Sequence, residues 1–310
     1  MQDSWLWLPR RNPSLVIRVE PARAALAGMS VYDPNSARKR MAARLLRVIL
    51  SSGLSKPLAR PDLPGTLDPT WWDTWFDQVA IPQLGSVVPA AFRLKSAPER
   101  LSSLLVNDSG TPVGFVKVRR RFEFGESARA LNGLQQATGF RVPRVIEWGS
   151  LEGYHFLLTT PLPRGLTHPA RLSNDHIASL VDEFRVLLRS QEPTGTQSGW
   201  VASHGDLARA NLRRASDGSI WLLDFDDFGW GPKLADWVLF VLDEQVNAWG
   251  SDRRRAKRAA GELSELGSSS EVLEAIRFWV EHPRRVLHSR QQTLLLLLSE
   301  HRRASARELQ

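Results

Sequence analysis

Cysteine is absent from this chain of 310 residues. Disulfide bonds, thiolate metal sites and a cysteine nucleophile are therefore all excluded. Long apolar runs are missing too, because the longest run of leucine covers only residues 294–298, far too few to cross a bilayer. The first residues, MQDSWLWLPRR, lack the basic and then apolar pattern of a signal peptide. We therefore expect a cytoplasmic protein without a membrane span.

Several catalytic motifs are also missing. The sequence has no GxxxxGK[ST] phosphate loop, no GxGxxG after a strand pattern and no HExxH zinc motif. Ser203 stands beside His204, but no GxSxG surrounds it, so a hydrolase nucleophile is not indicated. There is also no internal repeat and no low-complexity tract.

The charge that is present is mainly positive. A net charge of +8 predicts attraction to anions, which include nucleotides, phosphosugars, nucleic acid and anionic membranes. The basic run DRRRAKR at 252–258 is interpreted as the solvated face of a C-terminal helix. No zinc-finger spacing, RNA-binding aromatic signature or heptad zipper accompanies it, so we expect no nucleic-acid partner.

The hydrophobic pattern divides the chain into three parts. Residues 1–88 form an opening unit with an amphipathic helix in SARKRMAARLLRVILSSG and a tryptophan-rich helix after a proline-rich connection. Its tryptophans, Trp71, Trp72 and Trp75, suit either stacking on a sugar ring or burial, and we favour burial. Residues 89–160 alternate as strands around one helix, with a hairpin predicted at the turn NDSG. Residues 161–310 are mainly helical, so the fold class is predicted to be α+β with two lobes. The first of these helices has apolar residues at three- and four-residue spacing, which predicts a buried stripe of Ile177, Leu180, Val181, Phe184, Leu187 and Leu188.

Oxygen-bearing side chains are concentrated in SHGDLARANL and in the following IWLLDFDDFGWGPKLAD. Phosphoryl transfer from a nucleotide requires a group that orients the acceptor hydroxyl and oxygens that hold magnesium. Asp206 lies on a predicted loop, the Asn211 amide follows five residues later, and Asp224 ends an apolar strand. Amide and carboxylate oxygens suit magnesium, and protein kinases space their catalytic aspartate and asparagine in the same way. An ordinary solvated loop is the alternative interpretation.

HGDLARANL together with LLDFDDFGWGPKLAD resembles the aminoglycoside phosphotransferase and choline kinase family, in which glycine replaces the arginine after histidine of protein kinases. Gly231, Pro232 and Asp236 also stand in register. The resemblance extends over about residues 90–300 and is strong in 203–237. It implies a protein-kinase-like fold with a small antiparallel-sheet N-lobe and a mainly helical C-lobe, to which residues 1–88 are an addition. It also implies ATP and Mg²⁺ as cofactors.

Carried over by position, the resemblance implies that Asp206 is the catalytic aspartate. Asn211 and Asp224 would be the magnesium ligands, His204 a supporting residue, and Asp236 a brace for the catalytic loop. Asp226 and Asp227, the two further carboxylates of the second motif, would contact a second metal or a cationic substrate, or be solvated turn residues, which we favour.

The same resemblance implies a strand lysine that binds the nucleotide phosphates and a helix glutamate that pairs with it. Lys117 in GFVKV lies in a strand pattern between Val116 and Val118, and we favour this role over that of an edge lysine. Its partner is Glu126 at the start of the next helix, or Glu123 nearby.

The remaining nucleotide contacts depart from the family pattern. No GxGxxG precedes the strand of Lys117, so Ser96 and its neighbours are the candidates for backbone donors to phosphate. LLTTPLPRG resembles the adenine-binding hinge. Because Pro161 has no N–H, the backbone donors there would be Thr160 or Leu162.

We therefore expect an ATP- and Mg²⁺-dependent phosphotransferase that acts on a hydroxyl of a small molecule such as a sugar, an aminoglycoside or an amino alcohol. The acceptor pocket is predicted in the helical region after residue 232. Trp237, Trp249 and Trp279 are candidates for its wall, although we favour core packing for each. The alternative function is a nucleotide-binding pseudokinase or assembly module without transfer activity.

Overall fold

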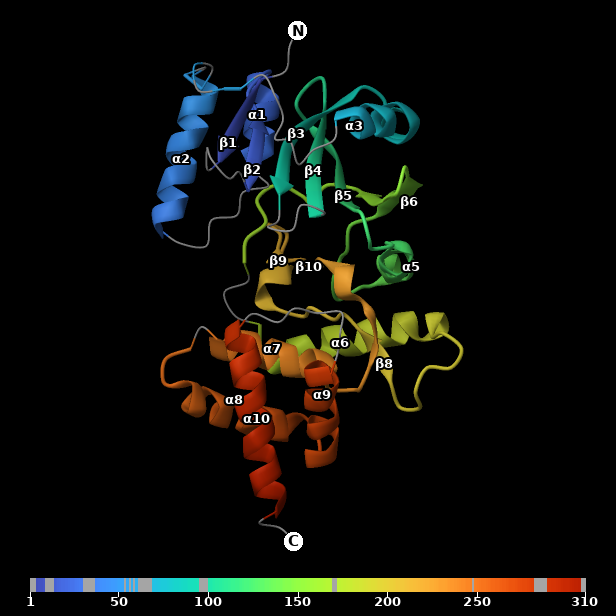
Figure 1. Cartoon of the computed structure of the whole chain (residues 1–310), viewed down its shortest axis with the longest axis vertical. Coiled ribbons are helices and arrows are strands. Elements are labelled where there is room, and N and C mark those ends of the chain that lie inside the picture. The colour runs from blue at the N-terminus through green and yellow to red at the C-terminus, as the bar shows by residue number, and fades with distance from the viewer. Residues whose placement is uncertain are drawn as a thin grey trace. The chain divides into compact units, whose positions relative to one another are not determined.

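The computed structural model describes residues 4–8, 14–29, 37–52, 54–55, 57, 59–60, 69–94, 100–168, 172–246, 248–281 and 289–307. Ser96 lies outside these residues. The chain forms two compact units (Figure 1): Met1–Ala128 with Pro143–Arg164, and Arg129–Val142 with Gly165–Gln310.

The first unit is built on a seven-stranded antiparallel sheet with the order β1-β2-β3-β4-β5-β7-β6. Its strands are β1 Trp5–Leu8, β2 Leu15–Arg18, β3 Val87–Leu94, β4 Arg100–Asn107, β5 Pro112–Arg119, β6 Val145–Leu151 and β7 Tyr154–Thr159. The predicted hairpin is confirmed as β4 and β5. Its turn is stabilised by the Asn107 side chain, which accepts hydrogen bonds from the backbone N–H groups of Ser109 and Thr111.

The sheet contains three strands, β1, β2 and β3, that the alternation pattern did not predict. β1 and β2 are only four residues long, too short for a reliable period-two signal. They come from the opening 88 residues and extend the same sheet as β4 to β7.

Helices α1 Ala22–Gly28, α2 Ala37–Ser51, α3 Pro69–Trp75 and α4 Ile81–Leu84 belong to the same unit, and α5 Gly125–Gly133 begins in it. The three tryptophans of α3 are buried, which confirms the preference for burial over an exposed sugar platform. They pack with Trp5, Phe92 and Phe156 in one apolar cluster on the sheet. This aromatic packing joins α3 to β1 and β3 and so ties the opening residues to the sheet.

The second unit is mainly helical. Its helices are α6 Asn174–Leu188, α7 Ala235–Val246, α8 Asp252–Leu266, α9 Ser269–Glu281 and α10 Ser289–Arg307. Two small antiparallel ladders pair β8 Val201–Ser203 with β11 Gly229–Gly231, and β9 Leu212–Arg214 with β10 Ile220–Leu222. The apolar stripe of α6 is buried as its spacing predicted, and the side chain of Ser173 caps its first turn. A strand-rich unit and a helical unit confirm the predicted α+β class.

Three predictions about single side chains in this unit have different outcomes. Trp237 and Trp279 are buried in the core, as favoured, and the Trp279 indole donates to the Ala235 carbonyl oxygen. Trp249 is 95% exposed, so the preference for core packing was wrong there. It lies between α7 and α8, outside any helix whose periodicity would bury it.

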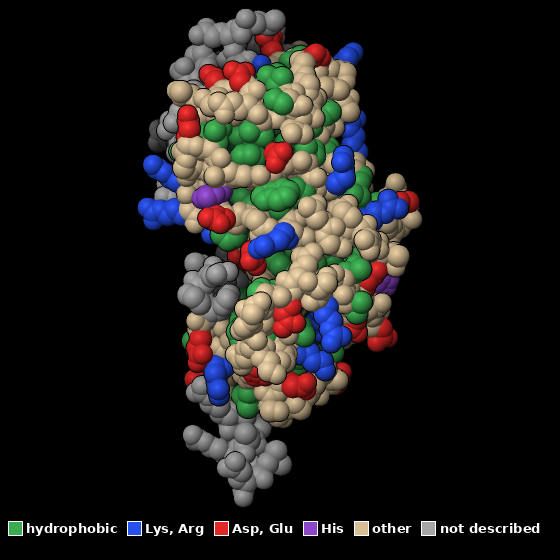
Figure 2. All heavy atoms as spheres, turned by 90° about the vertical axis from the view of Figure 1, so that its right-hand side faces the viewer, with side chains coloured by type: hydrophobic (Ala, Val, Ile, Leu, Met, Phe, Trp, Pro, Cys, Tyr) green, Lys and Arg blue, Asp and Glu red, His purple; other side chains and the backbone are tan. Residues whose placement is uncertain are grey.

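The surface agrees with the interpretation of the basic run. Arg253, Arg254 and Lys257 of α8 are exposed, whereas Arg255 is buried and donates to the Ala248 carbonyl and to Asp252. On the face drawn in Figure 2, basic and acidic side chains are interspersed among the described residues, and the basic ones form only small groups. Among the residues described, no helix is long and apolar enough to span a membrane.

Candidate active site

The loop after β8 starts with a glycine that no other residue replaces easily. Gly205 has φ of +75°, a region that side chains disfavour. A Cβ at this position would also overlap the backbone carbonyl oxygen of Asp227. The missing side chain therefore lets the loop of residues 204–211 lie against the turn that follows β10.

Asp236, at the start of α7, holds this loop through hydrogen bonds to its first residues. Its carboxylate is almost fully buried and accepts hydrogen bonds from the Ser203 hydroxyl at 2.9 Å, the His204 N–H at 2.9 Å and the Gly205 N–H at 3.0 Å. Burial lowers the pKa of the Arg185 guanidinium, and the nearby negative charge of Asp236 opposes that shift. The buried carboxylate is thus balanced by three donors and a neighbouring cation.

His204 connects the loop to the end of β10. Its Nδ1 lies 3.2 Å from the backbone nitrogen of Asp206, and its Nε2 lies 3.0 Å from the carbonyl oxygen of Leu223. Since an N–H and a carbonyl oxygen can only donate and accept respectively, Nδ1 is the acceptor and Nε2 carries the proton. This neutral tautomer is buried beside Phe225 and fixes the separation of the two segments.

Asp206 and Asn211 lie side by side across the loop. The Asn211 amide nitrogen donates to the Asp206 carbonyl oxygen at 2.8 Å and to Asp206 Oδ2 at 3.0 Å. These bonds orient the half-buried Asp206 carboxylate. Because both use the amide nitrogen of Asn211, its amide oxygen points the other way and is the atom suited to a metal.

Asp224 directly follows Leu223, the residue after β10 that bonds to the loop of residues 204–211. The N–H of Leu223 donates to the Asn211 carbonyl oxygen at 2.9 Å, and Asp224 itself has φ of +67°, a left-handed conformation that is uncommon for residues other than glycine. Residues held in such conformations cluster at functional sites, although aspartate adopts this one more readily than most residues. The neighbouring Asp226 is buried, so it is not the solvated turn residue that we favoured.

The donor set fits magnesium rather than a metal held by protein alone. In the described part of the chain, no group of three or more His, Asp or Glu residues is placed to hold a metal. Mg²⁺ keeps several waters and binds through one or two protein oxygens together with substrate phosphates. One carboxylate from Asp224 and one amide oxygen from Asn211 are chemically sufficient for that mode.

The predicted nucleotide residues belong to the other unit. Lys117 is half-buried in β5, opposite Ser102 of β4 and Leu157 of β7. Glu126 lies in the first turn of α5, where its charge also favours the helix N-terminus. Glu123 lies just before that helix and is exposed.

In the segment that resembles the adenine-binding hinge, one of the two predicted backbone donors already forms a hydrogen bond within the protein. The N–H of Thr160 donates to the Arg144 carbonyl oxygen at 2.8 Å, and the Thr160 hydroxyl accepts from the Arg144 N–H at 2.9 Å. The backbone N–H of Leu162 is therefore the better candidate for adenine.

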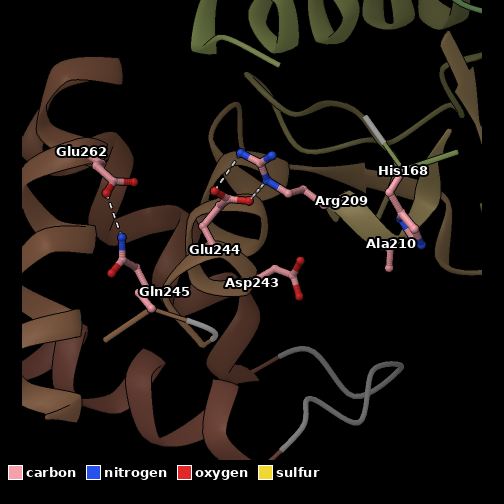
Figure 3. A pocket seen from close by; sticks show the side chains of 8 residues that line it. His168, Arg209, Ala210, Asp243, Glu244, Gln245 and Glu262 are labelled. Carbon is pink, nitrogen blue, oxygen red and sulfur yellow. Dashed lines mark hydrogen bonds and ion pairs between the residues drawn. The ribbon is translucent and has the colours of Figure 1, made fainter. Parts of the chain in front are cut away.

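A cavity of about 650 Å³ opens beside the loop, within the helical unit (Figure 3). Arg209 and Ala210 of the loop line it together with residues from α7 and α8, with Ala248 between these two helices and with His168. Glu244 of α7 forms an ion pair with the Arg209 guanidinium, and Gln245 donates to Glu262 of α8 at 2.8 Å. The Arg209–Glu244 pair lies between the loop and α7, with 30% and 29% of these side chains exposed.

The lining of this cavity is acidic. Asp243, Glu244 and Glu262 outnumber Arg209. Burial raises the pKa of Glu262, although the Gln245 hydrogen bond and the positive charge of Arg258 oppose this shift. Sequence reasoning missed these cavity residues, because α7 and α8 read as ordinary buried or solvated helices. The only signal was the acidic pair in LDEQ, which follows an apolar run.

No protein-family model and no curated protein sequence matches the chain. Solved structures are similar to it at low identity. They include aminoglycoside phosphotransferase APH(4)-Ia in complex with AMP-PNP and hygromycin B (11% identity, 75% of this chain, 99% of that chain, TM-score 0.44). Choline kinase LicA from Streptococcus pneumoniae is another (9%, 75%, 99%, 0.41), as is amicoumacin kinase hAmiN with AMP-PNP and Ca²⁺ (11%, 77%, 96%, 0.37).

Proposed function

We propose that this protein is an ATP- and Mg²⁺-dependent phosphotransferase that acts on a hydroxyl group of a small molecule. The observation that carries the proposal is the hydrogen bond of 3.0 Å between Asn211 and the Asp206 carboxylate, in a loop that also lines the cavity. The buried Asp236 carboxylate, which accepts three hydrogen bonds from residues 203–205, argues against the alternative of an ordinary solvated loop.

In this proposal Asp206 orients the acceptor. Its carboxylate accepts the hydrogen bond of the incoming hydroxyl, whose oxygen attacks the γ-phosphorus of ATP. The new oxygen–phosphorus bond forms as the bond from the γ-phosphorus to the bridging oxygen breaks, and ADP leaves. The hydroxyl proton passes to Asp206 Oδ and then to solvent. Phosphoryl transfer of this kind depends on positioning and charge more than on covalent catalysis.

The remaining residues hold the nucleotide. When bound, Mg²⁺ neutralises the negative charge of the phosphates. Asn211 and Asp224 would hold it, and Lys117 would bind the phosphates with Glu126 as its partner. Leu162 would donate to adenine, with Thr160 beside it in the hinge. In this division residues 89–160 bind nucleotide and 161–310 carry the catalytic loop and the acceptor site.

The cavity supports an acceptor that carries an amine. Its excess of carboxylates favours a cation, and its volume of about 650 Å³ lies in the range of small-molecule sites. Aminoglycosides and amino alcohols combine a hydroxyl with an ammonium group, which a carboxylate binds as an ion pair, whereas a neutral sugar can offer Asp243 and Glu262 only hydroxyl hydrogen bonds.

Nucleotide turnover with a panel of aminoglycosides, amino alcohols and neutral sugars tests this proposal. We expect Asp206→Ala to lower acceptor-dependent ADP release by about 10²-fold or more while ATP affinity stays near that of the wild type. Asp224→Ala should lose magnesium-dependent nucleotide binding. Asp217→Ala, which removes an exposed aspartate from the β9–β10 turn of the same unit, is the matched control and should change neither quantity.

Two results would contradict the proposal. Turnover that is unchanged in Asp206→Ala would remove this residue from the chemistry. Binding of ATP and Mg²⁺ without turnover on any acceptor would favour the alternative of a nucleotide-binding pseudokinase or assembly module.

A further inference from the structure

Among the described residues, helix α2 presents two apolar faces, one of which is buried and the other exposed. Ala43 and Leu50 are buried in an apolar cluster with β1, β2 and α1, and Leu46 packs against it. On the opposite side of the helix, Met41, Leu45 and Val48 are 71%, 62% and 61% exposed. At 3.6 residues per turn these three side chains lie within about 60° of one another and about 180° from Leu50.

The charge of α2 has one sign. Residues 37–51, ARKRMAARLLRVILS, contain five basic residues and no acidic residue. Arg44 and Arg47 are exposed and follow one edge of the apolar stripe. α2 lies at the edge of the first unit in Figure 1, beside α1. An exposed apolar stripe with arginines along its border is the pattern of a helix that lies in the plane of a membrane interface.

Other occupants fit these features less well. A second copy of α2 would bring five further positive charges against the first five. A nucleic acid would satisfy the arginines but would leave Met41, Leu45 and Val48 against phosphates or water. An anionic bilayer accepts apolar side chains below its headgroups and arginines at its surface at the same time.

We propose that α2 docks the protein on anionic phospholipid membranes, with Met41, Leu45 and Val48 inserted below the headgroups and Arg44 and Arg47 at the phosphates. This inference goes beyond the proposed phosphotransferase function and does not depend on it. It assigns a role to the opening residues, which the catalytic loop leaves unexplained. A single short helix gives reversible association that salt weakens.

Vesicle flotation of the full chain tests the inference, with vesicles of phosphatidylcholine alone and of phosphatidylcholine mixed with phosphatidylglycerol. We expect binding to the anionic vesicles only. Arg44→Gln with Arg47→Gln should weaken it about 25-fold, from about fivefold for each basic side chain. Leu45→Ser with Val48→Ser should weaken it by at least as much at unchanged net charge.

Matched controls separate α2 from charge and apolarity elsewhere. Arg253→Gln with Arg254→Gln removes the same charge from α8, and Val186→Ser removes an apolar side chain that is 73% exposed on α6. Both should bind like the wild type. Thermal unfolding at the wild-type temperature shows that each α2 variant is folded, since all four α2 positions are exposed.

Three outcomes would overturn the inference: no binding to anionic vesicles, an equal loss of binding in the α8 and α2 charge variants, or self-association that Leu45→Ser with Val48→Ser abolishes. A tryptophan at Val48 gives an independent readout. Quenching of its fluorescence by brominated lipid is expected when it inserts, and the absence of quenching would contradict insertion.

Discussion

Replacing Asp236 with asparagine isolates the hydrogen bonds that hold the loop of residues 204–211. Oδ1 accepts from Ser203 and Gly205, whereas Oδ2 accepts from the His204 N–H. An asparagine retains one oxygen for the first two donors, but its amide nitrogen then faces the N–H of His204. That buried donor is left unsatisfied, and the other two bonds lose their ionic character. The cost adds to about 3 kcal/mol of local stability.

Amide hydrogen exchange measures this loss without any assumption about activity. A change of about 3 kcal/mol corresponds to about 100-fold faster exchange in peptides that contain residues 203–206. If the site transfers phosphate, displacement of the loop should also lower kcat by about 10²-fold. Asp182→Asn is the matched control, because it removes a second carboxylate near Arg185, 3.8 Å from its guanidinium, but one that is 76% exposed. Equal exchange in the two variants would refute the assignment of Asp236 as the brace.

Three further predictions concern single residues. Gly205→Ala should lower the free energy of unfolding in urea by more than about 2 kcal/mol, because left-handed strain and backbone overlap act together. Gly218 also has positive φ but open space around it, so Gly218→Ala should lower that free energy by only about 1 kcal/mol. Equal losses in the two variants would contradict the overlap at Gly205. Because the pKa of Glu262 is raised in the folded protein, its stabilising contribution is present at low pH and is lost as pH rises from 4.5 through the raised value. Glu262→Gln should therefore flatten the dependence of the urea midpoint on pH in that window. Parallel curves for the variant and the wild type would contradict this prediction. Trp249 is exposed and adjoins Ala248 of the cavity wall. Trp249→Ala should therefore raise KM for an acceptor several-fold and leave kcat unchanged in steady-state kinetics. An unchanged KM would exclude Trp249 from the acceptor site.

Local pattern was sufficient for much of the molecule. The turn NDSG predicts its hairpin because the Asn107 side chain bonds its own neighbours, and the spacing in α6 predicts a buried face because one helix period decides it. The motif around Asp206 and Asn211 is likewise local, since the two residues meet within one loop.

Local pattern failed where the outcome depended on distant partners. Trp249 and Asp226 both depart from what their residue types favour, since tryptophan is usually buried and aspartate usually exposed, and the segments packed around them determined the outcome. The strands β1 and β2 are too short to show alternation, and they exist because β2 pairs with the edge of β3 and β1 pairs with β2.

The amino-acid sequence by itself determined the chemistry available in the loop, namely a carboxylate, an amide and a second carboxylate at kinase-like spacing, because that chemistry is a property of side chains and of their separation along the chain. Only the tertiary structure decided that Asp236, 33 residues from Ser203, accepts the hydrogen bond of its hydroxyl, and that residues of the loop, α7 and α8 line an acidic cavity. Side chains so far apart in sequence meet only when helices and strands pack, and packing depends on the whole core and not on any single segment.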